Sequence, residues 1–291
     1  STLFPYTTLF RSRSNGSITV NAYEDGCLPL IIGELYGGGY NAPYSIYGCN
    51  QNGNTWSAKT SGTPYFGNNN PENRIDIDVN VYSCTSIGKV FGGGYGETAD
   101  VIGNTHVYIN MMKGLVDDPN NPGQRKFNAL GKIGQVFGGG NAASVKGDVT
   151  IDIGTATVYK YNTDPEEEAD YIGVQIESGN DYLNAESNTS TSITAGIYGG
   201  GYSADVDGNT TLNIGTANQD IINIAGDIFG GGYGEKTTVT GNVTVNIGKR
   251  TGSEQAGYSY DGYANITGDV YGGSAKGKVN ATKGGTKEAP T

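Results

Sequence analysis

The stretch that decides the fold is ITAGIYGGGY at residues 193–202, followed five residues later by GNTTLNIG at 208–215. Its centre is an aliphatic residue, an aromatic residue and a glycine tract, and this centre occurs six times in the 291 residues. The copies begin at Leu35, Val90, Val136, Ile197, Ile228 and Val270. Five tracts have three glycines, whereas the last has two, with Ser274 in the third place. Such a repeat predicts one structural unit stacked on copies of itself.

The second half of each repeat has a period of two. The strings VTIDI at 149–153, TTLNI at 210–214 and VTVNI at 243–247 place aliphatic or β-branched residues between Thr, Asp and Asn. This alternation, bounded by Gly and Asn, predicts strands with one buried face. No stretch has a convincing helical period, so we expect an all-β chain.

Equivalent strands of stacked repeats pair in parallel about 4.8 Å apart, so that like side chains form columns. The aliphatic residue that opens each copy is expected to point inward. The aromatic residue that follows it is the ligand-contact candidate, namely Tyr36, Phe91, Phe137, Tyr198, Phe229 and Tyr271. If exposed, this column would form an apolar strip on which sugar rings could stack. Alternatively, a bend at the glycines tucks the rings in, where they fill space or pack under the insertions.

A second column is expected at the turn before the alternating strand, at Asn104, Asp148, Asn209 and Asn242. Asn and Asp tolerate turn conformations and hydrogen-bond to nearby backbone. Stacked at one corner, these residues resemble the asparagine ladder of right-handed parallel β-helices. The resemblance covers residues 31–283 and implies a β-solenoid of about six coils with loop insertions.

The repeat core is also similar to the glycine-rich repeats of adhesin-like cell-surface proteins of gut bacteria. That resemblance implies an exported, extracellular protein. Its expected role is structural and adhesive, with glycan or host and cell-surface ligands as partners. The alternative is a carbohydrate-active β-helix enzyme, a polysaccharide lyase or glycoside hydrolase, with its site in the insertions. These fall mainly at about 111–131, 155–192 and 249–265.

The two ends of the chain are expected to lie outside the repeats. Residues 2–12, TLFPYTTLFRS, resemble a translated sequencing adapter, so residues 1–12 are set aside as an artefact of a metagenomic sequence. Residues 13–30 are interpreted as an N-terminal cap or partial coil, and 31–283 as the repeats. Residues 284–291 are interpreted as a tail or truncated linker.

The formal net charge of −11 argues against nucleic acid and anionic membrane surfaces as partners. No segment of the sequence has the length and apolar composition of a membrane span. The three cysteines, Cys27, Cys49 and Cys84, lack metal-site spacing and are assigned no role.

The glycine tracts are interpreted as structural, at a tight bend where backbones approach closely. A nucleotide-binding interpretation fails because no helix follows and no Lys-Ser/Thr pair is present. The segments 93–98 and 231–236 partly resemble the calcium motif GGxGxD, but Thr98 and Lys236 replace its aspartate. The acidic run 164–170 could hold calcium and is interpreted as a solvated loop. No cofactor is therefore expected, with calcium as the alternative.

The outward positions of the alternating strand are the second set of candidate catalytic positions. They offer Asp76 and Asp78 in one copy, His106 and Tyr108 in the next, and mainly Thr and Asn thereafter. Catalytic carboxylates need a partner carboxylate or a basic group nearby. The sequence indicates neither on this face, so His106 is interpreted as a surface residue and no catalytic residue is assigned.

Overall fold

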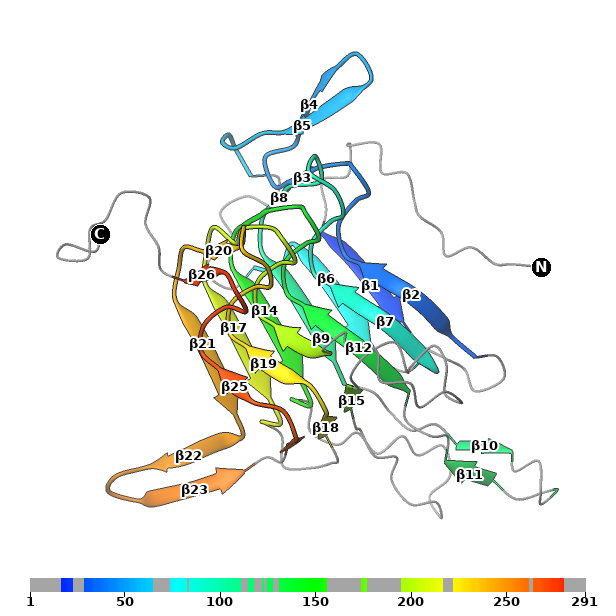
Figure 1. The fold of residues 1–291 in the computed structure, drawn as a ribbon, viewed down its shortest axis with the longest axis vertical. Coiled ribbons are helices and arrows are strands. Elements are labelled where there is room, and N and C mark those ends of the chain that lie inside the picture. The colour runs from blue at the N-terminus through cyan, green and yellow to red at the C-terminus, as the bar shows by residue number, and fades with distance from the viewer. Residues whose placement is uncertain are drawn as a thin grey trace.

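The computed structural model of the chain is all-β (Figure 1): every regular element in its described part is a strand. The described residues are 17–22, 29–64, 74–82, 84–110, 115–117, 122, 125–127, 131–155, 174–176, 195–216, 222–261 and 264–279. The residues set aside as adapter-derived and the tail at 284–291 lie outside these ranges, as do Cys27 and most of the expected cap.

The alternating strands of the repeats form one six-stranded parallel sheet, here called sheet 1. Its order is β1 (Ile18–Ala22), β6 (Ile77–Val81), β9 (Thr105–Ile109), β14 (Val149–Ile153), β17 (Thr210–Ile214) and β21 (Val243–Ile247). The strands pair without any shift in register, so that Ile18, Ile77 and Thr105 are level. Each of the first five sequence repeats therefore contributes one strand, and β1 adds the outermost strand at the N-terminal side.

The strands that lead into the glycine tracts form sheet 2, which is also parallel. Six of them carry the aliphatic–aromatic pair: β2 (Ile31–Tyr36), β7 (Ser86–Phe91), β12 (Lys132–Phe137), β16 (Gly196–Tyr198), β19 (Asp227–Phe229) and β25 (Val270–Tyr271). In the later repeats the start of this strand is a separate piece: β15 (Val174–Ile176), β18 (Ile222–Ile224) and β24 (Asn265–Ile266). The expected insertion at 155–192 thus contains a strand of the sheet, because Ile176 pairs with Ile133.

A third set of short parallel strands, sheet 3, lies between the other two along the chain. It comprises β3 (Tyr44–Ser45), β8 (Val101–Ile102) and β13 (Val145–Lys146), with β20 (Thr238–Val239) and β26 (Lys278–Val279) joined through bridges at Val206. In each of the first five repeats the chain passes through sheet 2, then sheet 3, then sheet 1, and the described part of the sixth repeat passes through sheets 2 and 3. Repetition of this order stacks each repeat on its predecessor.

Antiparallel hairpins extend from this body (Figure 1). They are β4 (Cys49–Asn52) with β5 (Thr55–Ala58), β10 (Leu115–Asp117) with β11 (Arg125–Phe127), and β22 (Lys249–Ser253) with β23 (Gly257–Asp261). The last two fall within the insertions expected at 111–131 and 249–265.

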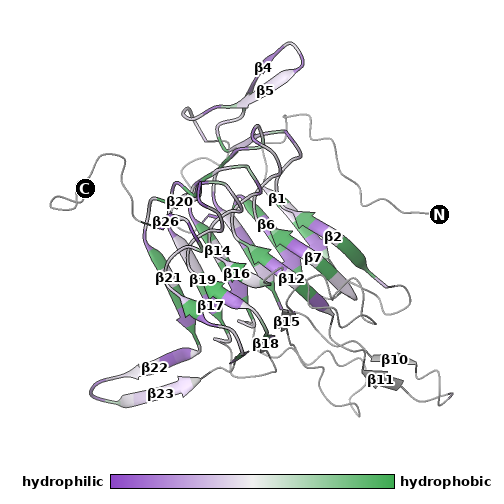
Figure 2. Ribbon diagram, viewed as in Figure 1, coloured by the Kyte–Doolittle hydropathy of each residue, from purple (hydrophilic) through white to green (hydrophobic). Residues whose placement is uncertain are grey.

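The core consists of the inward side chains of the sheets. Ile151, Ile197 and Ile228 are fully buried, and Thr150 and Asp152, between the buried residues of β14, are only partly covered. Figure 2 shows the same alternation of hydrophobic and hydrophilic residues along β6. The prediction that the aliphatic column points inward is therefore confirmed for the central repeats.

The glycine tracts lie where successive repeats come into backbone contact. A Cβ atom added to Gly200 would be 2.8 Å from the backbone N of Gly232, and one on Gly93 would be 2.7 Å from that of Gly140. None of the tract glycines has a positive φ. The left-handed residues come two positions after the tract, for example Ala142 (φ 54°) and Gly234 (φ 111°). The first five tracts are therefore glycine because an added Cβ would collide with the neighbouring repeat.

The predicted asparagine ladder is confirmed by hydrogen bonds. The Asn104 side chain accepts the backbone N–H of Asp148 at 2.9 Å, Asp148 accepts that of Asn209 at 2.8 Å, and Asn209 accepts that of Asn242 at 2.8 Å. Asp76 begins the ladder by accepting the Asn104 N–H at 2.7 Å. Each bond joins one repeat to the next and satisfies a corner N–H that the sheet leaves unpaired.

The close approach at the tracts can be tested by adding one methyl group. Gly200→Ala should lower the free energy of unfolding by about 1–3 kcal/mol, because the repeats must separate locally to admit Cβ. Gly273→Ala is the matched control, since this second glycine of the last tract has nothing within 4 Å of an added Cβ. Urea denaturation measures both. Equal stabilities of the two variants would contradict the packing described here.

Candidate functional site

The aromatic column predicted as the ligand contact is stacked along the repeats. Ring centroids are 4.7 Å apart for Tyr36–Phe91, Phe91–Phe137 and Phe137–Tyr198, with planes within 9° of parallel. Phe91, Phe137 and Tyr198 are at most 1% exposed. These three rings have no surface to offer a ligand, so the alternative of inward packing holds for them. Tyr36 and Phe229 are half-buried, and Tyr271 is 44% exposed at the C-terminal end.

A second row of aromatic residues covers the column. After each glycine tract the chain bends back and places a tyrosine over the column. The ring planes of these tyrosines are nearly perpendicular to those of the column, in the pairs Tyr95–Tyr36, Tyr202–Phe137 and Tyr233–Tyr198. Such edge-to-face contacts stabilise by about 0.5–1.5 kcal/mol each. At the N-terminal end of this row, Tyr40 is 72% exposed and stacks on Tyr95 at 5.3 Å.

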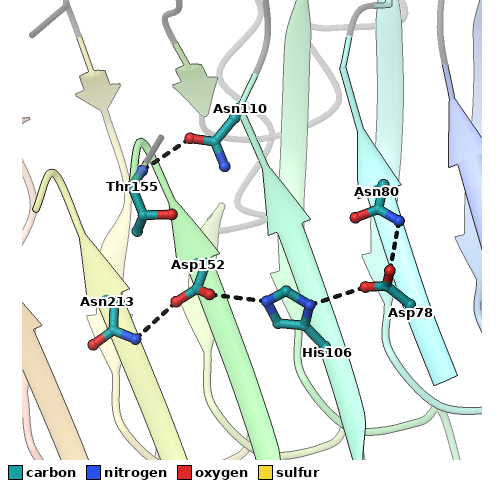
Figure 3. Close-up of polar contacts among 7 residues, drawn as sticks. All are labelled: Asp78, Asn80, His106, Asn110, Asp152, Thr155 and Asn213. Carbon is teal, nitrogen blue, oxygen red and sulfur yellow. Dashed lines mark hydrogen bonds and ion pairs between the residues drawn. The ribbon is translucent and has the colours of Figure 1, made fainter. Parts of the chain in front are cut away.

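The outward face of sheet 1 holds a cluster of charged side chains centred on His106 (Figure 3). Its Nδ1 is 2.9 Å from Asp78 Oδ1 on β6, and its Nε2 is 2.9 Å from Asp152 Oδ2 on β14. Asp78 is level with His106 on the neighbouring strand, whereas Asp152 lies two residues further along the next one. His106 does lie on the outward face of the sheet, but its ring is clamped between two carboxylates and is 13% exposed.

Amides extend the cluster across the sheet. Asn80 donates to Asp78 at 2.8 Å and to Asn21 at 3.1 Å, while Asn213 donates to Asp152 at 2.7 Å. Asn246 donates in turn to Asn213 at 2.8 Å. At the end of the same strands, the Asn110 side chain accepts the Thr155 N–H at 2.8 Å (Figure 3). The result is a row of polar contacts that follows the stack.

The ionisation of His106 follows from its two partners. Burial by itself would lower its pKa, but the hydrogen bonds to Asp152 and Asp78 outweigh burial and raise the pKa to about 9. Burial likewise opposes ionisation of Asp78, yet the bonds from His106 and Asn80 leave the pKa of that carboxyl lowered. At neutral pH the ring is a cation with both N–H groups engaged. It has no lone pair with which to accept a proton, so it does not act as a general base.

Asp76 does not lie on the outward face. Its side chain is 1% exposed and forms an ion pair with Arg74, whose Nε is 2.6 Å from Asp76 Oδ1. Its other oxygen caps the corner ladder at Asn104. The expectation that the outward face has no basic partner is wrong, since His106 bridges Asp78 and Asp152. Asp76, which was expected on the same face, is paired with Arg74 away from it.

The exposed aromatic residues that sequence reasoning missed lie on the hairpins. On β23, Tyr258 and Tyr260 are 46% and 75% exposed, and on β5 Trp56 is 36% exposed. Arg250 is directly opposite Tyr260 on β22, and its guanidinium carbon is 4.5 Å from the centre of the Tyr258 ring. Alternation along the strands places Arg250, Tyr258 and Tyr260 on one face of the hairpin. The Tyr-Ser-Tyr spacing within the expected insertion at 249–265 was the signal that could have identified them.

No group of three or more His, Cys, Asp or Glu residues in the described ranges is arranged to hold a metal ion. Thr98 and Lys236, which replace the aspartate of the calcium motif, are exposed. The acidic run 164–170 lies outside the described residues. Cys49 and Cys84 are free thiols, and burial raises the pKa of Cys49. A search of the described residues for a helix able to cross a membrane finds none.

The charge on His106 predicts a pH-dependent contribution to stability. A pKa of about 9 in the fold, against about 6.5 in the unfolded chain, means that this contribution is complete below about pH 6.5 and lost as pH rises through 9. His106→Asn should therefore lower the free energy of unfolding by about 1–2 kcal/mol at pH 6.5 and by little at pH 10. Thr244→Asn, in the same column on β21 and beside β17, a strand without carboxylates, is the control. A wild-type-minus-variant difference that does not change with pH would exclude the clamp.

Comparison with known proteins identifies no relative: no protein-family model matches the chain, and no curated protein or solved structure is significantly similar to it.

Proposed function

We propose that the chain is a right-handed parallel β-solenoid of about six coils that serves as a structural and adhesive segment of an exported bacterial surface protein. The fixed order of sheets 2, 3 and 1 in the first five repeats supports the solenoid. Its ligand is a saccharide of a host or neighbouring cell surface. The net charge of −11 suits such a protein in a salty extracellular medium.

The rigidity expected of a stalk has three sources in the packing. Corner side chains bond to the backbone of the next repeat, the polar row on sheet 1 links neighbouring strands, and the rings stack beside the glycine tracts. Each hydrogen bond contributes only about 1 kcal/mol. Because they recur in successive repeats, they oppose bending and slippage all along the stack.

The observation that carries the adhesive role is the face of the β22–β23 hairpin with Arg250, Tyr258 and Tyr260. The hairpin extends from the body (Figure 1), and both tyrosine rings are solvent-exposed. Aromatic faces stack on the C–H faces of sugar rings, while a guanidinium group donates to hydroxyl or carboxylate oxygens. Tyr, Ser and Gly, which are six of the thirteen residues 249–261, are also residues that binding loops of antibodies favour.

The alternative of a carbohydrate-active enzyme gains no support from the geometry. Asp78 and Asp152 are both engaged by His106, and Asp76 is buried against Arg74. A glycosidase or lyase needs a carboxylate or base free to exchange a proton with its substrate. The three carboxylates considered as catalytic candidates on sheet 1 are therefore all engaged in the packing of the stack.

The adhesive role is tested by a glycan array followed by titration of the best ligand. The double variant Tyr258→Ala/Tyr260→Ala should weaken binding at least tenfold, about 1.4 kcal/mol. The matched control Tyr258→Phe/Tyr260→Phe keeps both rings and should bind within about threefold of the wild type.

A reducing-sugar assay on the same glycans separates the two functions. The adhesive proposal expects no release of reducing ends. It is abandoned if any polysaccharide is turned over, or if the array shows no glycan bound above background.

A further inference from the structure

The two ends of the stack have strand edges without a neighbour in the described part of the chain. At the C-terminal end β21 pairs with β17 and β25 with β19. At the N-terminal end β1 pairs with β6 and β2 with β7. An unpaired strand edge is a template for another strand.

The C-terminal edge also exposes residues that are core residues elsewhere. Val270 is 45% exposed, whereas Ile228, level with it on β19, is fully buried. Ile247 is 43% exposed, whereas Ile214 on β17 is fully buried. Each of these side chains packs against the preceding strand on one side and is exposed to solvent on the other.

The hydrogen-bond ladders give this edge a direction. In the Asn and Asp ladders the later repeat donates to a side-chain oxygen of the earlier one: Asn242 N–H to Asn209, Asn246 Nδ2 to Asn213, and Asp269 N–H to Asp227. The last repeat therefore offers acceptor oxygens on Asn242, Asn246 and Asp269 to whatever follows.

The N-terminal edge offers the matching donors. Ser17 is level with Asp76 in the corner column, Asn21 is level with Asn80 in the amide row, and Glu34 is level with Lys89 on sheet 2. The Ser17 N–H, the Asn21 Nδ2 and the Glu34 N–H thus occupy the donor positions of the three ladders. All three residues are exposed.

The apolar columns match as well. If the N-terminal edge of one stack followed the C-terminal edge of another in the same register, Leu35 would lie on Val270, Tyr36 on Tyr271 and Ala22 on Ile247. Interior repeats make the same contacts, as in Val136–Ile197 and Phe137–Tyr198.

We propose that the partner of the C-terminal edge is the N-terminal edge of a second copy of this chain, so that copies associate head to tail. The contact is heterologous, since each edge complements the other and not itself. The copies each carry a charge of −11, so their repulsion weakens association at low ionic strength.

Sedimentation velocity of the full chain, from about 1 to about 500 µM, tests the proposal. The weight-average mass should rise with concentration, and more steeply in 0.5 M than in about 0.05 M NaCl because added salt screens the repulsion. A monomer throughout this range at both salt concentrations overturns the proposal.

A mixing experiment distinguishes head-to-tail contacts from any other self-association. Val270→Lys blocks the C-terminal edge and Leu35→Lys the N-terminal edge, so each variant alone should be monomeric. An equimolar mixture should form dimers and nothing larger, because one interface remains wild type on both sides. Thr211→Lys, on the outward face of β17 and one strand inside the edge, is the control and should associate like the wild type.

A second pair of variants serves if circular dichroism shows that either lysine variant is unfolded. Ile247→Lys then replaces Val270→Lys at the C-terminal edge, and Thr19→Pro replaces Leu35→Lys at the N-terminal edge. Thr19 is exposed, and its N–H points away from β6 because that of Ile18 points toward it. If folded single-edge variants still associate on their own, or if their mixture stays monomeric, the contact is not head to tail.

Discussion

Backbone contact at the glycine tracts is the constraint on which the rest of the structure depends. With no Cβ at these positions, carbonyl and amide groups of successive repeats approach within hydrogen-bond distance, as in Gly93 N–H to Gly139 O at 3.1 Å. The spacing this sets, about 4.8 Å between parallel strands, is also the distance at which planar rings stack. The aromatic column beside the tracts and the Asn and Asp ladder at the other corner thus share one repeat distance.

The same spacing explains why the charged cluster on sheet 1 needs a cation. Side chains on adjacent strands of this sheet are close enough to touch, so Asp78 and Asp152 on either side of β9 would repel each other across an uncharged residue. Other repeats place Thr in the column where His106 stands, for example Thr150 and Thr211. His106 therefore compensates locally for two carboxylates, and its chemistry is explained by its neighbours along the stack.

Much of the fold could be predicted from the sequence because it depends on features that repeat. The alternation in VTIDI and the Asn and Asp turn residues gave the parallel strands of sheet 1 and the corner ladder, including the level pairing of Asn104 with Asp148. Burial of Phe91 and Phe137 could not be predicted from the alternation, because it depends on the bend after each tract. That bend folds a second aromatic row over the first. That bend arises at residues as different as Ala142 and Gly234, which share no sequence signal.

The site was harder to predict because its residues deviate from the repeat. Asp76 looked like an outward residue by alternation, but it precedes β6 and turns into the corner, where Arg74 neutralises it. The Asp78–His106–Asp152 cluster becomes visible only when the repeats are aligned level by level. Tyr258 and Tyr260 belong to a hairpin that no repeat specifies, so their exposure follows from three-dimensional placement alone.

The insertions have a consequence for how such a chain can evolve. Gly199 and Gly230 are 31 positions apart and Gly138 and Gly199 are 61 apart, yet the rings beside them stack at 5.3 and 4.7 Å. Loop length is thus uncoupled from the geometry of the stack. Recombination can lengthen, shorten or exchange a loop without disturbing the register of its neighbours, so the outer loops are free to diversify while the glycine tracts stay fixed.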